Sequence, residues 1–300
     1  MKYLLKQVFL FVLLITSLIA LMIILSDYAV KSRKETLLKV DDHVKYIFSG
    51  NSYVECSVND GLIDHSINIA TSGEVYLYSY AKIKSLLECN DQINTVFIGF
   101  SYRDLLKYTE DMWLFGDISV VEFVKNYNYI LSSSDKSLIL KHNPKAYISG
   151  LIESVFPNFT AFFRSLLPEK SENNRLRNFG GYLYLLRDNL QESIELFETN
   201  DQEPFVDSQI QKQYLIMLSQ LCQKESVRLI LLNTPKYPLY NENINHEVRQ
   251  NWISIRERLH VDSLLDFSDM VLQDSCYGDI THLNYRGAKV FSLYLNDLLK

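Results

Sequence analysis

The 300-residue chain has little of several residue types, and each shortage excludes a class of protein. Ten glycines and six prolines are too few for a collagen-like or low-complexity chain. Four cysteines are too sparse for a disulfide framework, and none has the spacing of zinc-finger ligands. The sequence therefore favours free buried thiols, although one bridge stays open if the chain folds outside the cytoplasm.

The chain also lacks clusters of charge of one sign. The chain has 30 basic and 36 acidic residues, which alternate in short mixed runs without a basic stripe. This argues against nucleic acid as a partner. The histidines outside the C-terminal segment show no metal-ligand spacing, so we expect neither a metal site nor a cofactor. In contrast, 47% hydrophobic residues are enough for a sizeable core.

One long apolar run stands at the N-terminus. Residues 8–25 carry no charge and, at about 1.5 Å per residue, would span roughly 27 Å, close to the thickness of a bilayer core. A cleavable signal peptide is the alternative, but the run is long and no clean A-x-A-like site follows it. We expect an uncleaved single-pass anchor. Lys2 and Lys6 favour an N-terminus inside and a domain outside, in the periplasm or on the cell surface, whereas Lys31, Arg33 and Lys34 weaken that orientation.

Short continuous apolar runs after residue 43 predict buried parallel strands. The five predicted strands cover residues 44–48, 66–70, 94–98, 227–232 and 263–266. Helical periodicity follows at 78–88, 207–225 and 286–299, the last as a closing helix. Strands that alternate with helices indicate an open α/β sheet.

The predicted organisation has three parts. Residues 1–26 form the membrane anchor, 27–42 a juxtamembrane linker, and 43–300 the α/β domain. Residues 103–206, rich in Tyr, Phe, Asn and Ser, lack strand patterns and are predicted to be a largely helical insertion between the third and fourth strands.

Small polar residues follow four of the predicted strands, and the carboxyl ends of parallel strands are where ligands bind. These residues are Gly50-Asn51-Ser52, Ser72-Gly73, Gly99-Phe100-Ser101 and Asn233-Thr234. Ser52 is the candidate nucleophile, since it would stand near a helix N-terminus whose amides favour an anion. Taken alone, a Gly-Asn-Ser segment is more typical of a simple turn.

A second candidate segment lies near the C-terminus, where Asp279 and His282 stand three residues apart before the closing helix. At a turn, this spacing lets the carboxylate hold one ring nitrogen while the other faces the cleft as a general base. A simple helix-capping loop is the alternative. Together with Ser52, these residues supply the three roles of a Ser-His-Asp triad, which is recognised by geometry and not by chain order.

The combination resembles the SGNH (GDSL-like) hydrolase superfamily. Phe48 to Ser52 is similar to the first block, with Asn51 where Asp is commoner, and Asn68 to Gly73 is similar to the second. Ser101 stands where the third block has an asparagine, and Asp279, His282, Gly287 and Ala288 match the last block. The resemblance covers about residues 44–101 and 227–300. The predicted fold is thus a flavodoxin-like three-layer α/β/α sandwich with a mostly parallel sheet, preceded by a transmembrane helix.

The resemblance implies a serine esterase or O-acyltransferase that acts on acyl esters of a cell-envelope glycan, or on a small acyl ester, through an acyl-enzyme. Asp279 would orient His282, and Gly73 would give an oxyanion-hole amide. Because Ser101 replaces the usual asparagine, its hydroxyl, or the amide of Asn51, Asn68 or Asn233, would have to donate instead. The loss of one such donor typically costs about 10²–10³ in rate. The alternative is therefore a weak or inactive member that serves as a glycan-binding or assembly factor.

Overall fold

The core of the protein is a five-stranded, all-parallel sheet. In this computed structural model, which describes residues 1–167, 176, 179–199 and 206–300, the strands are β1 (Tyr46–Ser49), β2 (Ser66–Asn68), β3 (Thr95–Gly99), β4 (Arg228–Asn233) and β5 (Ser263–Asp266). Their order is β2-β1-β3-β4-β5. The central strands β1, β3 and β4 are almost completely buried, which explains their continuous apolar sequences. The predicted α/β class with a parallel sheet is confirmed.

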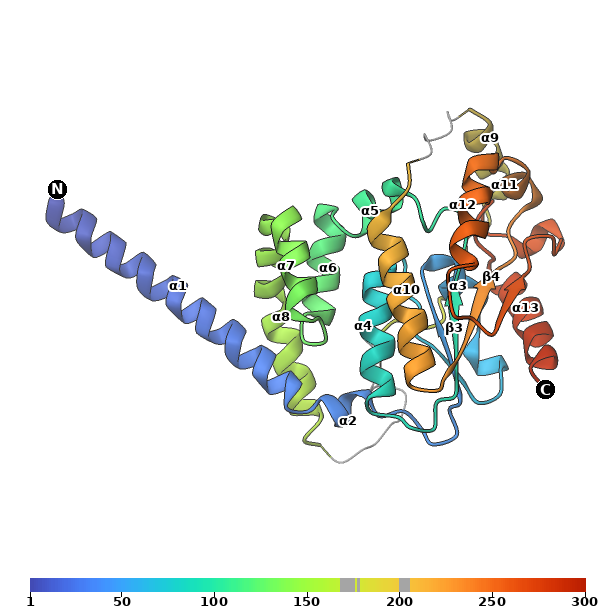
Figure 1. Cartoon of the computed structure of the whole chain (residues 1–300). Coiled ribbons are helices and arrows are strands. Elements are labelled where there is room, and N and C mark those ends of the chain that lie inside the picture. The colour runs from blue at the N-terminus through green and yellow to red at the C-terminus, as the bar shows by residue number, and fades with distance from the viewer. Residues whose placement is uncertain (168–175, 177–178, 200–205) are drawn as a thin grey trace. The chain divides into compact units, whose positions relative to one another are not determined.

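Four helices pack around this sheet. They are α3 (Ser52–Ser57), α4 (Tyr76–Leu87), α10 (Gln209–Lys224) and α13 (Tyr285–Leu298). Figure 1 shows α4 and α10 together on one side of the sheet and α13 on the other, where it packs against α3. Among the residues described, the same part of the chain also contains four shorter helices and two 3₁₀ turns. The helices are α5 (Lys107–Trp113), α9 (Leu190–Thr199), α11 (Pro238–Glu242) and α12 (His246–Arg256), and the turns are Asp60–Leu62 and Asp274–Cys276.

The chain divides into two compact units, one of which contains the sheet. That unit comprises Lys39–Leu114 and Glu172–Lys300, and the other comprises Met1–Leu38 and Phe115–Ser171. The anchor, linker and insertion boundaries drawn from the sequence stay predictions.

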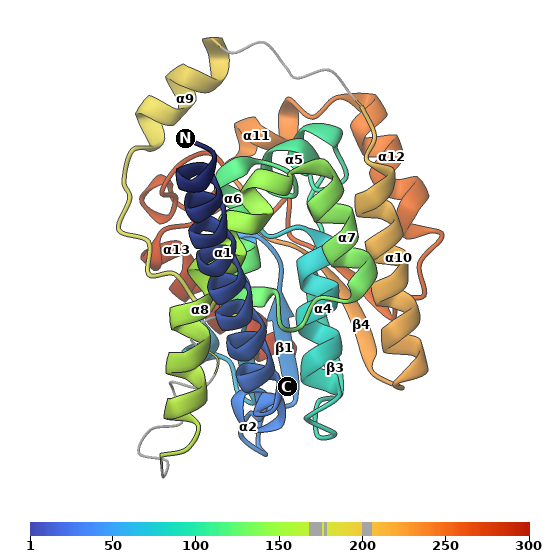
Figure 2. The same ribbon diagram turned by 90° about the vertical axis from the view of Figure 1, so that its left-hand side faces the viewer.

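The smaller unit is helical and includes the apolar N-terminus. Its helices are α1 (Lys2–Lys31), α2 (Lys34–Leu38), α6 (Asp117–Tyr127), α7 (Ser133–His142) and α8 (Pro144–Arg164). Figures 1 and 2 show α8 beside the C-terminal half of α1, and the two helices are in contact. By length and composition, α1 is able to cross a membrane.

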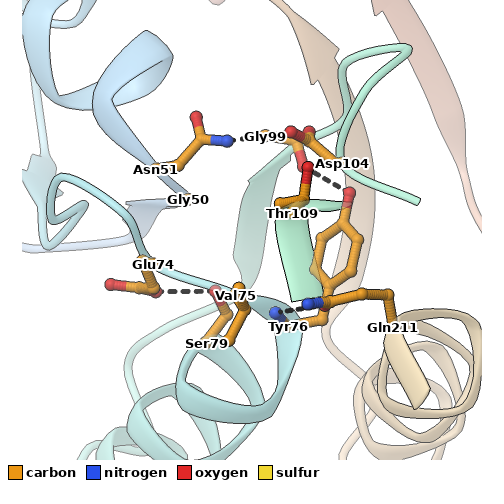
Figure 3. Close-up of a pocket in the computed structure, with 10 residues that line it drawn as sticks. All are labelled: Gly50, Asn51, Glu74, Val75, Tyr76, Ser79, Gly99, Asp104, Thr109 and Gln211. Atoms are coloured by element: carbon orange, nitrogen blue, oxygen red, sulfur yellow. Dashed lines mark hydrogen bonds between the residues drawn. The ribbon is translucent and has the colours of Figure 1, made fainter. Parts of the chain in front are cut away.

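A small cavity lies beneath the carboxyl ends of β1 and β3 (Figure 3). Its volume of about 10 Å³ is at the lower limit for holding one water molecule, so the cavity is too small for a substrate. Glu74 and Asp104 line it together with Tyr76, whose hydroxyl donates to the Gly99 carbonyl at 3.0 Å. This cavity therefore belongs to the polar core that supports the loops after the strands.

All four cysteines are free. Cys56, Cys222 and Cys276 are buried and Cys89 is half-buried. Free thiols, mostly buried, agree with the interpretation favoured from their spacing.

Candidate active site

Two segments that are distant in sequence meet at the carboxyl edge of the sheet. Ser52 is the first residue of α3, three positions after the end of β1. Asp279 and His282 lie in the loop between the Asp274–Cys276 turn and α13. Asn284 holds this loop, because its side chain accepts from the Arg286 amide at 2.9 Å and donates to the Tyr277 carbonyl at 3.1 Å.

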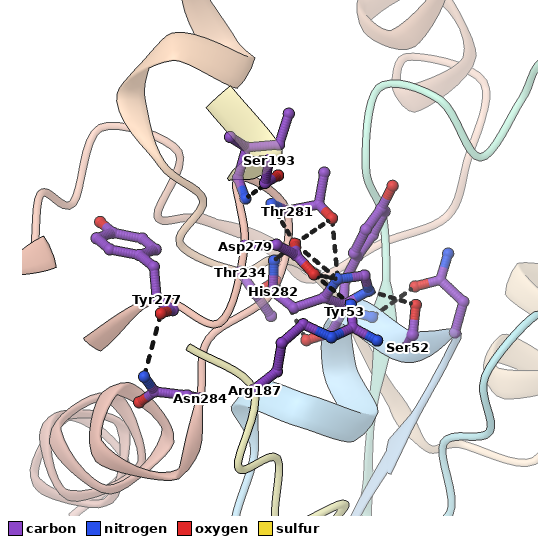
Figure 4. A network of polar contacts seen from close by, with 12 residues as sticks. Ser52, Tyr53, Arg187, Ser193, Thr234, Tyr277, Asp279, Thr281, His282 and Asn284 are labelled. Atoms are coloured by element: carbon purple, nitrogen blue, oxygen red, sulfur yellow. Dashed lines mark hydrogen bonds and ion pairs between the residues drawn. The ribbon is translucent and has the colours of Figure 1, made fainter. Parts of the chain in front are cut away.

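The three predicted triad side chains are in hydrogen-bond contact (Figure 4). His282 Nε2 lies 2.8 Å from Ser52 Oγ, and His282 Nδ1 lies 2.9 and 3.0 Å from the two carboxylate oxygens of Asp279. With Nδ1–H donating to the carboxylate, Nε2 is free to accept the serine proton. The geometry is that of a nucleophile joined to a base and of a base joined to its orienting group.

Asp279 has several further donors. The amides of Thr281 and His282 donate to Oδ1 at 2.8 and 2.9 Å, as does the Thr281 hydroxyl at 2.8 Å. Burial alone would raise the pKa of Asp279, but the hydrogen bond and charge of His282 and the Thr281 donors outweigh it and hold that pKa well below its ordinary value. Asp279 is thus an anion at neutral pH.

Arg187 is a fourth member of this network that the sequence did not indicate. Its Nη1 donates to Asp279 Oδ2 at 2.5 Å, and its side chain is 48% exposed. Arg187 stands in an irregular segment before α9, at a distance of 92 residues in sequence from Asp279, and belongs to no motif. No sequence signal could have connected the two.

The segment that carries Arg187 is an extended strap, residues 179–189, which lies across both halves of the site. The Leu183 amide donates to the Glu55 carbonyl of α3 at 2.9 Å, and the Asn189 amide donates to the Gly278 carbonyl at 3.2 Å. The Tyr285 amide donates to Leu185 at 3.0 Å, at the start of α13. The strap therefore binds the serine-bearing helix and the histidine-bearing loop together.

Comparison with known proteins adds one partial match. The model of a single, uncharacterised family matches residues 188–300, which include Asp279 and His282 but not Ser52. No curated protein matches the chain.

The loop after β2 contains Gly73, the predicted oxyanion donor. Gly73 has φ +72°, and a Cβ atom there would lie 2.3 Å from Trp113, so glycine is required at this position. The loop contacts the segment that carries Ser52 on both sides of the serine. The Thr71 amide donates to the Gly50 carbonyl at 3.0 Å, and the Ser72 hydroxyl donates to Glu55. The amide of Ser52 is the first of α3, a position whose N–H group has no intrahelical acceptor.

Asn51 and Ser101, two other predicted donors, are joined by a buried carboxylate. Asn51 donates its side-chain amide to Asp104 Oδ1 at 2.8 Å, and its Oδ1 caps α3 by accepting from the Tyr53 amide at 3.1 Å. Ser101 is buried and donates its backbone amide to Asp104 Oδ2 at 2.6 Å. Burial raises the pKa of Asp104 to about 6, against the opposing effect of these donors and of Lys236. Asp104 thus fixes the two loops that follow β1 and β3.

Asn68 and Asn233 also bind within the protein. The Asn68 amide donates to the Val58 carbonyl at 2.7 Å, and its Oδ1 accepts from the Ala70 amide at 2.8 Å. Asn233 donates to Asp266 at 3.0 Å and accepts from Lys236 Nζ at 2.9 Å. Both side chains are therefore engaged within the protein, where they support the loops.

Two further residues beside the triad were not predicted. The Tyr53 ring is centred 5.5 Å from the His282 ring, and Lys236 Nζ lies 4.7 Å from the centroid of the Tyr53 ring. Burial lowers the pKa of Lys236 to about 8, although Asp104 and Asp266 oppose the shift. Burial, together with Tyr240 and Asp104, raises the pKa of Tyr53 well above its usual value, which keeps the phenol neutral. A buried lysine after a strand has no distinctive sequence pattern.

No group of three or more His, Cys, Asp or Glu side chains is placed to bind a metal ion among the residues described. The site that the structure assembles consists of a hydroxyl, an imidazole, a carboxylate and a guanidinium. Such a set is suited to proton transfer and nucleophilic attack.

Proposed function

We propose that the protein is a serine-dependent esterase or O-acyltransferase of the SGNH type that acts on acyl esters of a cell-envelope glycan. The observation that carries the proposal is the continuous Ser52–His282–Asp279 hydrogen-bond chain. Its supports include the order β2-β1-β3-β4-β5, which is the order of flavodoxin-like three-layer sandwiches, and the position of Ser52 after β1, beside the point where the strand order reverses.

In the proposed reaction, Ser52 Oγ attacks the acyl carbonyl carbon while His282 Nε2 takes the hydroxyl proton. Asp279 keeps Nδ1–H in place and stabilises the imidazolium. The tetrahedral intermediate collapses, and His282 returns the proton to the leaving sugar oxygen, which leaves an acyl group on Ser52. Water or a second sugar hydroxyl then attacks the acyl carbonyl and gives its proton to His282. The second tetrahedral intermediate collapses, the bond between the acyl carbon and Ser52 Oγ breaks, and His282 returns the proton to Ser52 as the acid or the new ester leaves. The choice of acceptor separates hydrolysis from transfer.

The backbone amides of Ser52 and Gly73 are the proposed oxyanion donors. The Ser101 backbone amide is already bonded to Asp104, so its buried hydroxyl stays the weaker candidate for a third donor. A hole with two backbone donors predicts a slower enzyme than one with an additional side-chain donor, by about 10²–10³.

The proposed cellular location of the protein depends on α1. We propose that α1 is a single-pass anchor with its N-terminus inside, so that the sheet-containing unit lies in the periplasm or on the cell surface. Acylated envelope glycans would be accessible there.

A fluorophosphonate probe tests the proposal, because it reacts only with an activated serine. We expect labelling of the full-length protein, no labelling of S52A or H282A, and normal labelling of S57A. Ser57 is a suitable control because it lies in the same helix and is buried. Labelling that persists in S52A would contradict the assignment of the nucleophile.

The second candidate is an inactive SGNH-fold protein that binds glycan or assists assembly. The burial of Ser101 at the position of the usual oxyanion asparagine favours it. Absence of probe labelling in the folded wild-type protein, combined with measurable binding of acetylated glycan, would select this function.

A further inference from the structure

Helix α8 of the smaller unit has one apolar face that is buried and a second that is exposed. Ala146, Tyr147, Gly150, Ser154 and Asn158 are buried, and the Tyr147 hydroxyl donates to Asn128 at 3.1 Å. The exposed side chains Ile148, Ile152, Phe156 and Phe163 recur at intervals of four and seven residues. At 3.6 residues per turn they form one stripe, opposite the buried face.

The exposure along this stripe is unusually high for aromatic side chains. Phe156 is 80% exposed and Phe163 is 61% exposed, and the stripe continues into Leu166 and Leu167 just after the helix. Between Lys145 and Arg164, the helix contains a single charged residue, Glu153. A contiguous apolar face of this kind usually marks a membrane or protein contact.

The position of the stripe relative to α1 indicates which contact it makes. Ser26 and Val30 of α1 are buried, and α1 packs on α8 within one compact unit. Just after α1, Arg33 donates to the Ser165 carbonyl at 2.8 Å and to its hydroxyl at 3.1 Å. The C-terminal end of α8 therefore lies where α1 leaves its apolar stretch.

Basic residues gather at this junction. Lys31, Arg33 and Lys34 follow the apolar stretch of α1, and Arg164 is the last residue of α8. An apolar stripe that ends in a basic cluster is the pattern of helices that lie in the boundary between acyl chains and anionic headgroups.

We infer that α8 is an interfacial membrane helix, with Ile152, Phe156 and Phe163 inserted at the acyl–headgroup boundary of the bilayer that α1 enters. Arg33 and Arg164 would then lie at the level of the lipid phosphates. The inference depends on membrane insertion of α1 and is independent of the chemistry of Ser52. It also gives Lys31, Arg33 and Lys34 a role in lipid contact that does not concern the orientation of α1.

Site-specific fluorescence in vesicles tests this inference. Full-length protein with Cys89 replaced by Ser receives a single new cysteine, Phe156→Cys or Glu153→Cys, which is labelled with the environment-sensitive dye NBD. Glu153 is the matched control because its side chain is 51% exposed on the same helix, yet lies 3.9 Å from Lys125 of α6, away from the stripe. The vesicles contain phosphatidylcholine and phosphatidylglycerol, with or without nitroxide-labelled lipid.

We expect blue-shifted emission at residue 156 that nitroxide lipids quench at least twofold more strongly than emission at residue 153, independently of the protein-to-lipid ratio. Equal, weak quenching at both positions would refute the inference. A blue shift at residue 156 that lipids do not quench and that fades on dilution of the protein in lipid would also refute it, and would assign the stripe to a second copy of the chain. Circular dichroism of both labelled variants checks that the unit is folded.

Discussion

Replacement of Arg187 by glutamine tests the electrostatics of the site most directly. Arg187 Nη1 is 2.5 Å from Asp279 Oδ2, which is 3.0 Å from His282 Nδ1, so the guanidinium charge lies within about 5.5 Å of the imidazole. A unit charge at that distance contributes roughly 0.8 kcal/mol in water and about 3 kcal/mol at an effective dielectric constant of 20. Since the Arg187 side chain is 48% exposed, the lower part of this range applies, about 1 kcal/mol, or roughly fivefold in rate.

The sign of the effect follows from the charges. The positive charge of Arg187 disfavours the imidazolium that forms on His282 when it takes the Ser52 proton in the proposed reaction. R187Q should therefore raise the rate of fluorophosphonate labelling by about fivefold, whereas R187K, which keeps the charge, should stay close to wild type. The labelling rate is measured for both variants and for wild type, so slow turnover does not affect the comparison. An unchanged or lower labelling rate in R187Q would refute the reasoning.

Three further predictions concern the supports of the site and are measured by denaturant unfolding in mild detergent. Burial raises the pKa of Asp104 to about 6, so the folded state holds a proton that the unfolded chain releases near pH 4. The free energy of unfolding should therefore fall by up to about 3 kcal/mol as the pH rises through that interval. D104N should flatten this slope, and an unchanged slope contradicts the assignment. K82M leaves Glu74 buried without its cation and should cost about 3–5 kcal/mol, whereas K125M, at a more exposed ion pair, should change little. G287A places a Cβ atom 2.2 Å from the Cys276 carbonyl oxygen, so the start of α13 should shift. The free energy of unfolding should then fall by about 1–3 kcal/mol, and probe labelling should slow. Wild-type stability and labelling in G287A would contradict this prediction.

Much of the fold was predictable because buried parallel strands have continuous apolar sequences. The strand predicted at residues 94–98 is β3, Thr95–Gly99, and the one predicted at 227–232 is β4, Arg228–Asn233. The closing helix predicted at 286–299 is α13, Tyr285–Leu298. Shifts of one residue are within the ordinary fraying of element ends.

The candidate site was predictable only where chemistry is concentrated in short motifs. Asp279 and His282 lie on one turn, and Ser52 follows the end of a strand. The hydrogen bonds of Asn68 and Asn233 depend on the paths of loops, which periodicity does not reveal, so their engagement with the backbone and with Lys236 was not foreseeable. Arg187 reaches Asp279 from a segment without regular structure, and a long-range contact of this type leaves no local pattern in a single sequence.

The separation of Ser52 from His282 by 230 positions has a consequence for biogenesis. The N-terminal helix and Ser52 are synthesised first, and Asp279 and His282 follow much later. Until residues 279–282 are made, Ser52 has neither of the side chains with which it shares the hydrogen-bond chain. The contact between Ser52 and His282 also depends on α13, which packs against the helix that carries Ser52. A chain that stops before residue 279 would therefore lack the proposed triad, whatever part of the sheet it has formed.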